Sequence, residues 1–469
     1  MGQTIFVPSE SGAGEPRVAA SPDTVKRLAG LGFDVIVEAG AGAASRIPDD
    51  EFTRAGAKIG KAADGAKADI VLKVRRPSAA ELKTYRQGAA VLASMDPYGN
   101  EGDVAAMGKA GISAFAMEFM PRITRAQSMD VLSSQANLAG YQAVIDAAEA
   151  YDRAIPMMMT AAGTVPAAKV FVMGAGVAGL QAIATARRLG AVVTATDVRA
   201  AAGEQVASLG AKFVMTDALK DASGEGGYAR ELTEAEKKAQ GELVADHIAK
   251  QDIVITTALI PGRPAPKLVS ADMVKSMRPG SVIVDLAVER GGNVEGAKAG
   301  SVVTTANGVR IIGHLNVPGR IAASASLLYA KNLFAFLETM IDKETKTFSI
   351  DPGEELAKAT LLTHGGAVVH PNFARKDAAP KAGAKPVTRK AAPKKSAAKP
   401  APAPKKNAAK PASAPKAAAA AQDTVPAPDA KARAEAPLKF GATSKGPAVK
   451  VKPARKAPAR KPAAKGGKS

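Results

Sequence analysis

The stretch KVFVMGAGVAGLQAIATARRLGAVVTATD, residues 169–197, limits the possible folds of this chain more than any other feature. A short apolar run precedes the spacing G-x-G-x-x-G, and apolar residues at helical intervals follow it before a second alternating run. In this context of strand, turn, helix and strand, the glycines Gly174, Gly176 and Gly179 predict a dinucleotide-binding turn. They serve, in that order, the sharp turn, the approach of a pyrophosphate, and close packing of the helix on the strand.

The residues next to these glycines predict which dinucleotide binds. The first helical turn, with Val177 and Ala178, directs its free N–H groups and positive dipole end toward the anion. Asp197 lies 23 residues after Gly174, where an acid accepts hydrogen bonds from an adenosine ribose and repels a 2′-phosphate. This argues for NAD over NADP, although Arg199, two residues further on, could in principle meet a 2′-phosphate.

The net charge of the chain belongs to its C-terminal tail. The chain has 64 Lys and Arg against 44 Asp and Glu, and 24 of these basic and 4 of these acidic residues follow Arg375. Residues 1–375 therefore hold 40 of each sign and are neutral. Residues 376–469 consist mainly of Ala, Lys and Pro and contain few large apolar residues. Such a segment cannot bury enough apolar surface to offset the entropy of ordering, so a disordered basic tail is predicted.

Two interpretations of the tail stay open: a solubilising tether, or an electrostatic arm for anionic lipid or another polyanion. Its only aromatic residue is Phe440, so no specific nucleic-acid partner is predicted. The chain lacks cysteine, which excludes disulfides and thiolate metal sites, and no metal site of another kind is predicted. Its N-terminus does not resemble a signal peptide and no apolar run reaches membrane length, so a soluble chain is expected.

The remaining sequence alternates between strand and helix patterns, which predicts an α/β fold of two Rossmann-like, doubly wound domains. The first domain is expected to comprise residues 1–135 and 320–375, and the NAD(H)-binding domain residues 136–319. Strands are expected at 4–8, 34–38, 69–74, 170–173, 191–196, 212–215, 252–257, 281–286, 302–305 and 309–312. The main helices are expected at 24–31, 134–151, 232–250 and 322–342, and the last of them returns to the first domain. The strand at 302–305 is expected to be buried, and Met157, Met158 and Met159 to pack in the core.

The segment 120–133 is polar and has two interpretations. It could be a solvated loop before a helix, with Asp130 or Ser133 near the N-cap. It could instead face a ligand, because its Arg, Gln, Asp and Ser side chains supply donors and acceptors for an amide and a ribose. The residues alone do not decide between the two.

Five blocks of the sequence are distinctive: RITRAQSMDVLS at 122–133, MMMTAAGT at 157–164, GAGVAGL at 174–180, TATDVR at 194–199 and GHLNVP at 313–318. In order and spacing they resemble the NAD(H)-binding subunit of proton-translocating NAD(P) transhydrogenases, over residues 1 to about 375. The resemblance implies a homodimer that docks on a membrane-embedded subunit and an NADP(H)-binding beta subunit, at the cytoplasmic face of the inner membrane. Hydride then passes directly between NAD(H) on this chain and NADP(H) on the partner, coupled to proton movement.

The resemblance also assigns roles to the polar segment. Arg122, Asp130 and Ser133 match the residues that hold the nicotinamide carboxamide, and Gln127 matches the residue that reaches toward the partner cofactor. Direct hydride transfer requires alignment of two rings and no acid or base from the protein. Gln127, Arg122 and Asp130 are therefore expected to serve catalysis by positioning.

The same resemblance completes the expected cofactor site. Asp197 matches the ribose-binding acid of the family, and its neighbours Val198 and Arg199 are included in the site. Tyr228 matches a tyrosine on a mobile loop, and Leu259 a residue that lines the adenine side.

Alanine dehydrogenase is the nearest alternative, because this chain resembles it in fold and in Arg17 and Lys73, the substrate-carboxylate and catalytic lysine positions. Its catalytic histidine should fall within 93–96, where the sequence is ASMD, and its catalytic aspartate near Glu289. The missing general acid argues against amino-acid chemistry. A non-enzymatic NAD-binding protein with a polyanion-binding tail is the third possibility, which the intact cofactor residues make less favourable.

Overall fold

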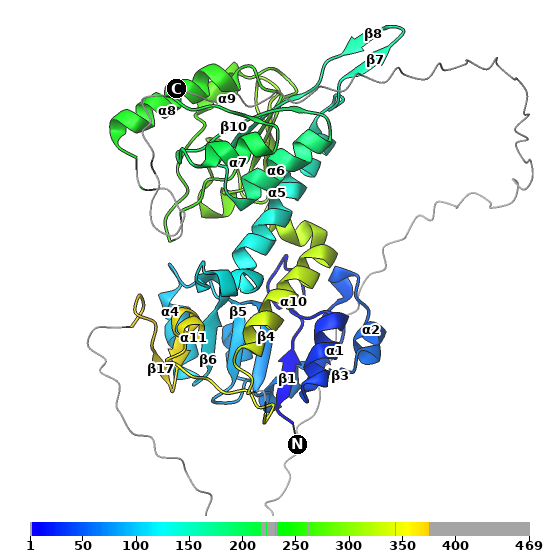
Figure 1. The fold of residues 1–469 in the computed structure, drawn as a ribbon, viewed down its shortest axis with the longest axis vertical. Coiled ribbons are helices and arrows are strands. Elements are labelled where there is room, and N and C mark those ends of the chain that lie inside the picture. Colours follow the sequence, from blue (N-terminus) through cyan, green and yellow to red (C-terminus); the bar gives the residue numbers. More distant parts are fainter. Residues whose placement is uncertain are drawn as a thin grey trace, which may run out of the picture. The chain divides into compact units, whose positions relative to one another are not determined.

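The computed structural model describes residues 2–216, 222, 230, 232–260, 262–342 and 344–374 (Figure 1). The predicted loop tyrosine, Tyr228, and the predicted tail, residues 376–469, lie outside the described residues. Two largely parallel sheets with helical crossovers confirm the predicted α/β class with two Rossmann-like units. Among the helices of the described residues, none is both long and apolar enough to cross a membrane.

The first sheet has six parallel strands in the order β3-β2-β1-β4-β5-β6. The direction of winding reverses between β1 and β4, so the sheet is doubly wound, as in dinucleotide-binding folds. The strands are β1 (Thr4–Val7), β2 (Asp34–Glu38), β3 (Lys58–Gly60), β4 (Ile70–Arg75), β5 (Ala90–Ser94) and β6 (Ser113–Ala116). The helices around this sheet are α1 (Pro22–Gly30), α2 (Asp49–Arg54), α3 (Ala79–Leu82), α4 (Glu101–Lys109) and α11 (Glu355–Thr360).

The second sheet repeats this order with one additional strand, β11-β10-β9-β12-β13-β15-β14. Its strands are β9 (Lys169–Met173), β10 (Val192–Thr196), β11 (Lys212–Phe213), β12 (Ile253–Thr256), β13 (Val282–Asp285), β14 (Ser301–Thr304) and β15 (Arg310–Gly313). Its helices are α6 (Val177–Arg188), α7 (Ala202–Ser208), α8 (Glu234–Ile248) and α9 (Ala271–Ser276). The reversal between β9 and β12 places a topological switch point beside the predicted fingerprint.

The prediction of a buried strand at 302–305 is wrong. Strand β14 pairs antiparallel with β15 at the edge of the sheet, and Val302 is 51% exposed. A short apolar run does not distinguish a central strand from an edge strand, because burial depends on neighbours that are distant in sequence.

Helices α5 (Val131–Ala150) and α10 (Ala322–Glu338) pack against each other (Figure 1). Helix α5 starts three residues earlier than predicted and continues to the second sheet, where it packs on α6. Helix α10 returns to the core of the first sheet through Tyr329, Leu333 and Phe336, as the sequence predicts. The Tyr329 hydroxyl also donates to the carbonyl oxygen of Lys73 at 3.1 Å. The two helices thus join the first core to the fingerprint.

The three consecutive methionines contradict the prediction of core packing. They lead into a hairpin, β7 (Met158–Thr160) and β8 (Gly163–Val165), which projects from the surrounding helices in Figure 1. Met157 is 62% exposed and Met159 is 80% exposed. A hairpin two strands wide has no second layer to cover it, so its apolar side chains face outward. A second small hairpin comprises β16 (Thr363–His364) and β17 (Ala367–Val368).

Candidate cofactor site

The predicted fingerprint forms the turn between β9 and α6. Gly174 has a φ of +98°, and a Cβ at this position would lie 2.5 Å from Oγ1 of Thr257. A Cβ on Gly179 would lie 1.8 Å from the carbonyl oxygen of Gly174, so a larger residue would push the helix away from the turn. A Cβ on Gly176 would meet nothing within 4 Å. Two of the glycines are therefore required by the local geometry, and the third borders open space.

The N-terminus of α6 has no side-chain cap. Its N-cap residue is Gly176, and no acidic residue lies in the first turn, which includes Val177 and Ala178. A helix of 12 residues presents its unpaired N–H groups and the positive end of its dipole at this point. This arrangement favours an anion such as a pyrophosphate.

Asp197 lies directly after β10, at the carboxyl edge of the second sheet. Its Oδ2 accepts hydrogen bonds from the Ala175 N–H at 2.7 Å and from Nη2 of Arg199 at 2.8 Å. Its Oδ1 accepts from the N–H and the Nε of Arg199, both at 2.9 Å. Burial acts to raise the pKa of this carboxyl, but the hydrogen bonds from Arg199 and Ala175 outweigh burial and hold the pKa of Asp197 below its usual value. Asp197 is thus an ionised acid that fastens the fingerprint turn.

Apolar side chains border the same edge. Leu259, three residues after β12, is 45% exposed, and Val198 is half-buried beside Asp197. Ligand sites in open α/β sheets lie outside the carboxyl ends of the strands, where both residues occur. Leu259 is therefore available to an apolar ligand face such as a purine.

The polar segment is more ordered than a solvated loop, because residues Thr124–Met129 form a 3₁₀ helix. Arg122 and Gln127 are exposed, whereas Asp130 is half-buried at the N-cap of α5. Oδ1 of Asp130 accepts from the Ser133 N–H at 2.9 Å, and its Oδ2 accepts from the Ser133 hydroxyl at 2.6 Å. The predicted N-cap is therefore confirmed at Asp130. Within the described residues, no hydrogen bond or ion pair joins Gln127 to the fingerprint.

Helix α5 brings this segment near the fingerprint. A Cβ on Gly140 would lie 2.0 Å from the carbonyl oxygen of Ala178, so α5 and the first turn of α6 touch. Nearby, Nδ2 of Asn137 donates to Oε1 of Gln181 at 3.2 Å. Ser133 precedes Gly140 by seven residues, which is about 10 Å along a helix. The polar segment and the fingerprint therefore lie within reach of one extended dinucleotide.

A buried charge cluster of Glu10, Glu15, Arg17, Lys73 and Glu81 occupies the carboxyl edge of the first sheet. Lys73 is fully buried, with its Nζ 2.7 Å from Glu81 and 3.4 Å from Glu10. Arg17 donates through Nε and Nη2 to the two carboxylate oxygens of Glu15, both at 2.7 Å. Burial raises the pKa of Glu10 above its usual value. Burial also acts to raise the pKa of Glu15, but the hydrogen bonds and the charge of Arg17 outweigh it, so the pKa of Glu15 is lowered. The sequence indicated Arg17 and Lys73 but not their acidic partners.

The positions expected to differ from alanine dehydrogenase have other structural roles. The N–H groups of Met95 and Asp96 donate to the buried carboxylate of Glu118, the first at 3.0 Å. Glu289 accepts a hydrogen bond from the Asn316 N–H at 2.5 Å. Segment 93–96 thus carries no imidazole, and its backbone is fixed by an acid.

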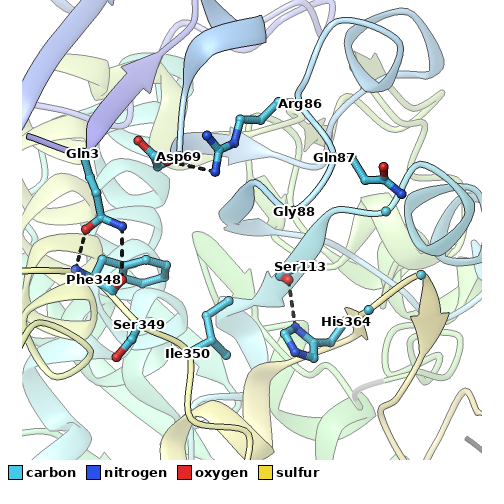
Figure 2. A pocket seen from close by; sticks show the side chains of 13 residues that line it. Gln3, Asp69, Arg86, Gln87, Gly88, Ser113, Phe348, Ser349, Ile350 and His364 are labelled. Carbon is cyan, nitrogen blue, oxygen red and sulfur yellow. Dashed lines mark hydrogen bonds and ion pairs between the residues drawn. The ribbon is translucent and has the colours of Figure 1, made fainter. Parts of the chain in front are cut away.

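A hollow of about 570 Å³ lies at the opposite, amino edge of the first sheet (Figure 2). Five of the polar side chains that line it are paired with one another or with the backbone. The pairs are Asp69 with Arg86, Gln3 with the Phe348 backbone, and Ser113 with His364. Because these five side chains already have partners, this hollow is a weaker candidate than the fingerprint edge.

Two protein-family models match the chain. "Alanine dehydrogenase/PNT, N-terminal domain" matches residues 6–139, and "Alanine dehydrogenase/PNT, C-terminal domain" matches residues 143–371. An NAD(P) transhydrogenase alpha subunit of Rhodospirillum rubrum is 55% identical over 376 residues, which is 78% of this chain and 98% of that protein. An alanine dehydrogenase of Mycobacterium tuberculosis is 33% identical over 299 residues, 63% of this chain and 75% of that protein.

The solved structures give the same grouping. A transhydrogenase from Sinorhizobium meliloti is 68% identical, with a TM-score of 0.71, and the match covers 78% of this chain and 100% of that one. An L-alanine dehydrogenase is 25% identical, with a TM-score of 0.67 and coverage of 79% and 98% of the two chains.

Proposed function

This chain belongs to the alanine dehydrogenase/PNT family, among the NAD(P) transhydrogenase alpha subunits, and we propose that it is the NAD(H)-binding subunit of a proton-translocating transhydrogenase. One observation carries the proposal: the uncapped N-terminus of α6 lies beside an ionised Asp197 at the switch point of the second sheet. A pyrophosphate fits the former and an adenosine ribose fits the latter. The domain of residues 136–319 then holds the cofactor, and residues 1–135 with 320–375 form the companion domain.

In this proposal the polar segment positions the nicotinamide. Arg122, Asp130 and Ser133 hold its carboxamide, and Gln127 faces the cofactor of the partner subunit. NADH, when bound, supplies the hydride that NADP⁺ on the partner accepts. The side chains need only fix the geometry and exclude water, since no proton has to be exchanged with the protein. The capped start of α5 supports this role, because two hydrogen bonds hold Asp130 and Ser133 side by side.

The proposal includes partners. The chain acts as a homodimer that docks on a membrane-embedded subunit and an NADP(H)-binding beta subunit, peripheral to the cytoplasmic face of the membrane, and only the assembly couples hydride transfer to proton translocation. The exposed methionines of the β7–β8 hairpin support a protein contact, because large apolar side chains on a projecting hairpin favour burial against a partner.

The tail has a separate proposed role. Its 24 basic residues attract the subunit to anionic headgroups, at about 1 kcal/mol for each basic residue near the surface. Deletion of residues 376–469 is expected to abolish binding to anionic liposomes at low salt. Unchanged binding would contradict this role and leave the cofactor proposal untouched.

An alanine dehydrogenase activity has less support. Arg17 and Lys73 are present, but each is paired with a carboxylate, and no histidine lies within 93–96. If the chain bound NAD without catalysing a reaction, the polar segment would only cap and support helix α5 and would not position the nicotinamide.

A fluorescence titration of the purified protein with NADH and, separately, NADPH tests the proposal. The chain has no tryptophan, so emission from reduced nicotinamide can be measured with little background. Saturable NADH binding without NADH consumption after addition of pyruvate and ammonium is expected. Consumption would identify a dehydrogenase, and absence of binding would contradict both enzymatic assignments.

A further inference from the structure

The acid that selects the cofactor is paired with a guanidinium. Three donors of Arg199 reach the two oxygens of Asp197, and the Nε and Nη2 atoms form a bidentate pair at 2.9 and 2.8 Å. Such planar, charge-assisted pairs are among the stronger hydrogen-bonded contacts in proteins. The charge that should repel a 2′-phosphate is therefore neutralised in this structure.

The two side chains differ in how accessible they are to a nucleotide. The side chain of Asp197 is 6% exposed and that of Arg199 is 23% exposed, so the guanidinium is the more accessible partner. Asp197 is also held from the turn by the Ala175 N–H, whereas Arg199 lies two residues further along the chain. A nucleotide that approaches this edge meets a cation next to the acid.

A guanidinium fork matches a phosphate as well as it matches a carboxylate. We propose that Arg199 is a latent 2′-phosphate site that Asp197 keeps occupied, and that the two residues together set the preference for NAD(H). This inference rests on the proposed function, since it concerns the same nucleotide edge. In this inference Arg199 determines which nucleotide binds, and does not merely support the ribose.

The test is a four-variant cycle in the full-length chain, with dissociation constants for NADH and NADPH measured by fluorescence. Asp197→Ser removes the competing carboxylate and leaves room for a phosphate, so NADPH affinity is expected to rise about 10-fold or more while NADH affinity falls. The double variant with Arg199→Ala is expected to lose that gain. Arg199→Ala alone is expected to increase the preference for NADH over NADPH, because the repulsion by Asp197 is then uncompensated.

Arg188→Ala is the matched control, because it removes an exposed arginine from the C-terminal turn of α6, at the end of the helix opposite to the fingerprint. It is expected to change both affinities less than about twofold, and a change as large as that of Arg199→Ala would overturn the inference as a mere effect of net charge.

The other outcomes are equally decisive. A gain in NADPH affinity that persists in the double variant, or no gain in Asp197→Ser, would overturn the inference. If Asp197→Ser does not fold, Arg199→Ala alone decides, and an unchanged ratio of the two affinities overturns it. Wild-type protein that binds neither nucleotide would overturn the proposed function together with the inference, whereas selective NADH binding with an inert Arg199 would overturn the inference only.

Discussion

The two sheets have the same strand order around their switch points, but their carboxyl edges are built in different ways. The edge of the first sheet is closed by the buried charge cluster, in which Lys73 and Arg17 already have carboxylate partners. The edge of the second sheet has a glycine turn and a helix whose N-terminus is uncapped. The comparison shows that a Rossmann-like topology provides the edge, and that a few local residues decide whether it is sealed or open to a ligand.

The largest effect is expected from breaking the sealed edge. Lys73→Met removes the cation that contacts both Glu10 and Glu81, and leaves buried carboxylates without it. Loss of one partner of a buried pair costs about 3–5 kcal/mol of unfolding free energy. Denaturant unfolding should show this loss, while NADH affinity of the folded protein stays within about twofold.

Lys58→Met is the control for that experiment. Lys58 also pairs with a carboxylate on the first sheet, Asp34 at 2.9 Å, but its side chain is 71% exposed. An exposed pair contributes about 1 kcal/mol or less. Equal losses from the two variants would show that the first edge is not held by its buried charges.

Closing the open edge should have the next largest effect. In Gly179→Ala the new Cβ would lie 1.8 Å from the Gly174 carbonyl oxygen, so α6 must shift. Overpacking of this kind costs about 1–3 kcal/mol, and the shift should also abolish measurable NADH binding. Gly241→Ala, in α8, is the control: its Cβ meets nothing within 4 Å, and it should stabilise the protein by about 1 kcal/mol with NADH affinity unchanged. Retained NADH binding by Gly179→Ala would remove the distinction between the two edges.

A smaller effect is expected in the polar segment, where Asp130 could cap a helix only or also bind the cofactor. Asp130→Ala and Thr233→Ala each remove an N-cap, from α5 and α8 respectively, and each should cost about 1 kcal/mol in thermal unfolding. Only Asp130→Ala should also weaken NADH binding, because α5 leads from the polar segment to the fingerprint. Equal NADH affinity in both variants would reduce Asp130 to a helix cap.

These edges also show what the sequence can predict. The fingerprint, Asp197 and the N-cap of α5 are local patterns, so their residues and spacing carry the prediction. The partners of Lys73 lie elsewhere in the chain, and no local pattern indicates that Glu10 and Glu81 meet it. The predictions for the methionine hairpin and for strand β14 failed for the same reason, since burial is decided by what covers an element. The sequence places Arg199 two residues after Asp197, but it did not predict that the two side chains pair.

The smallest effect is expected from His247, which packs against the strands that lead to the open edge of the second sheet. His247 in α8 lies with its Nε2 2.8 Å from Oγ1 of Thr194 on β10 and packs edge-on against Phe171. Burial, followed by the charges of Lys250 and Lys212, lowers the pKa of His247 in the folded protein. The unfolded chain therefore binds the proton first, so stability is complete above the ordinary histidine pKa and falls as pH drops toward the lowered folded pKa. His247→Gln should remove this pH dependence from the unfolding free energy. Lys212→Met should narrow the pH range over which stability falls, because the pKa of His247 in the folded protein then lies closer to its ordinary value. A profile that His247→Gln leaves unchanged would assign the pH dependence to other groups.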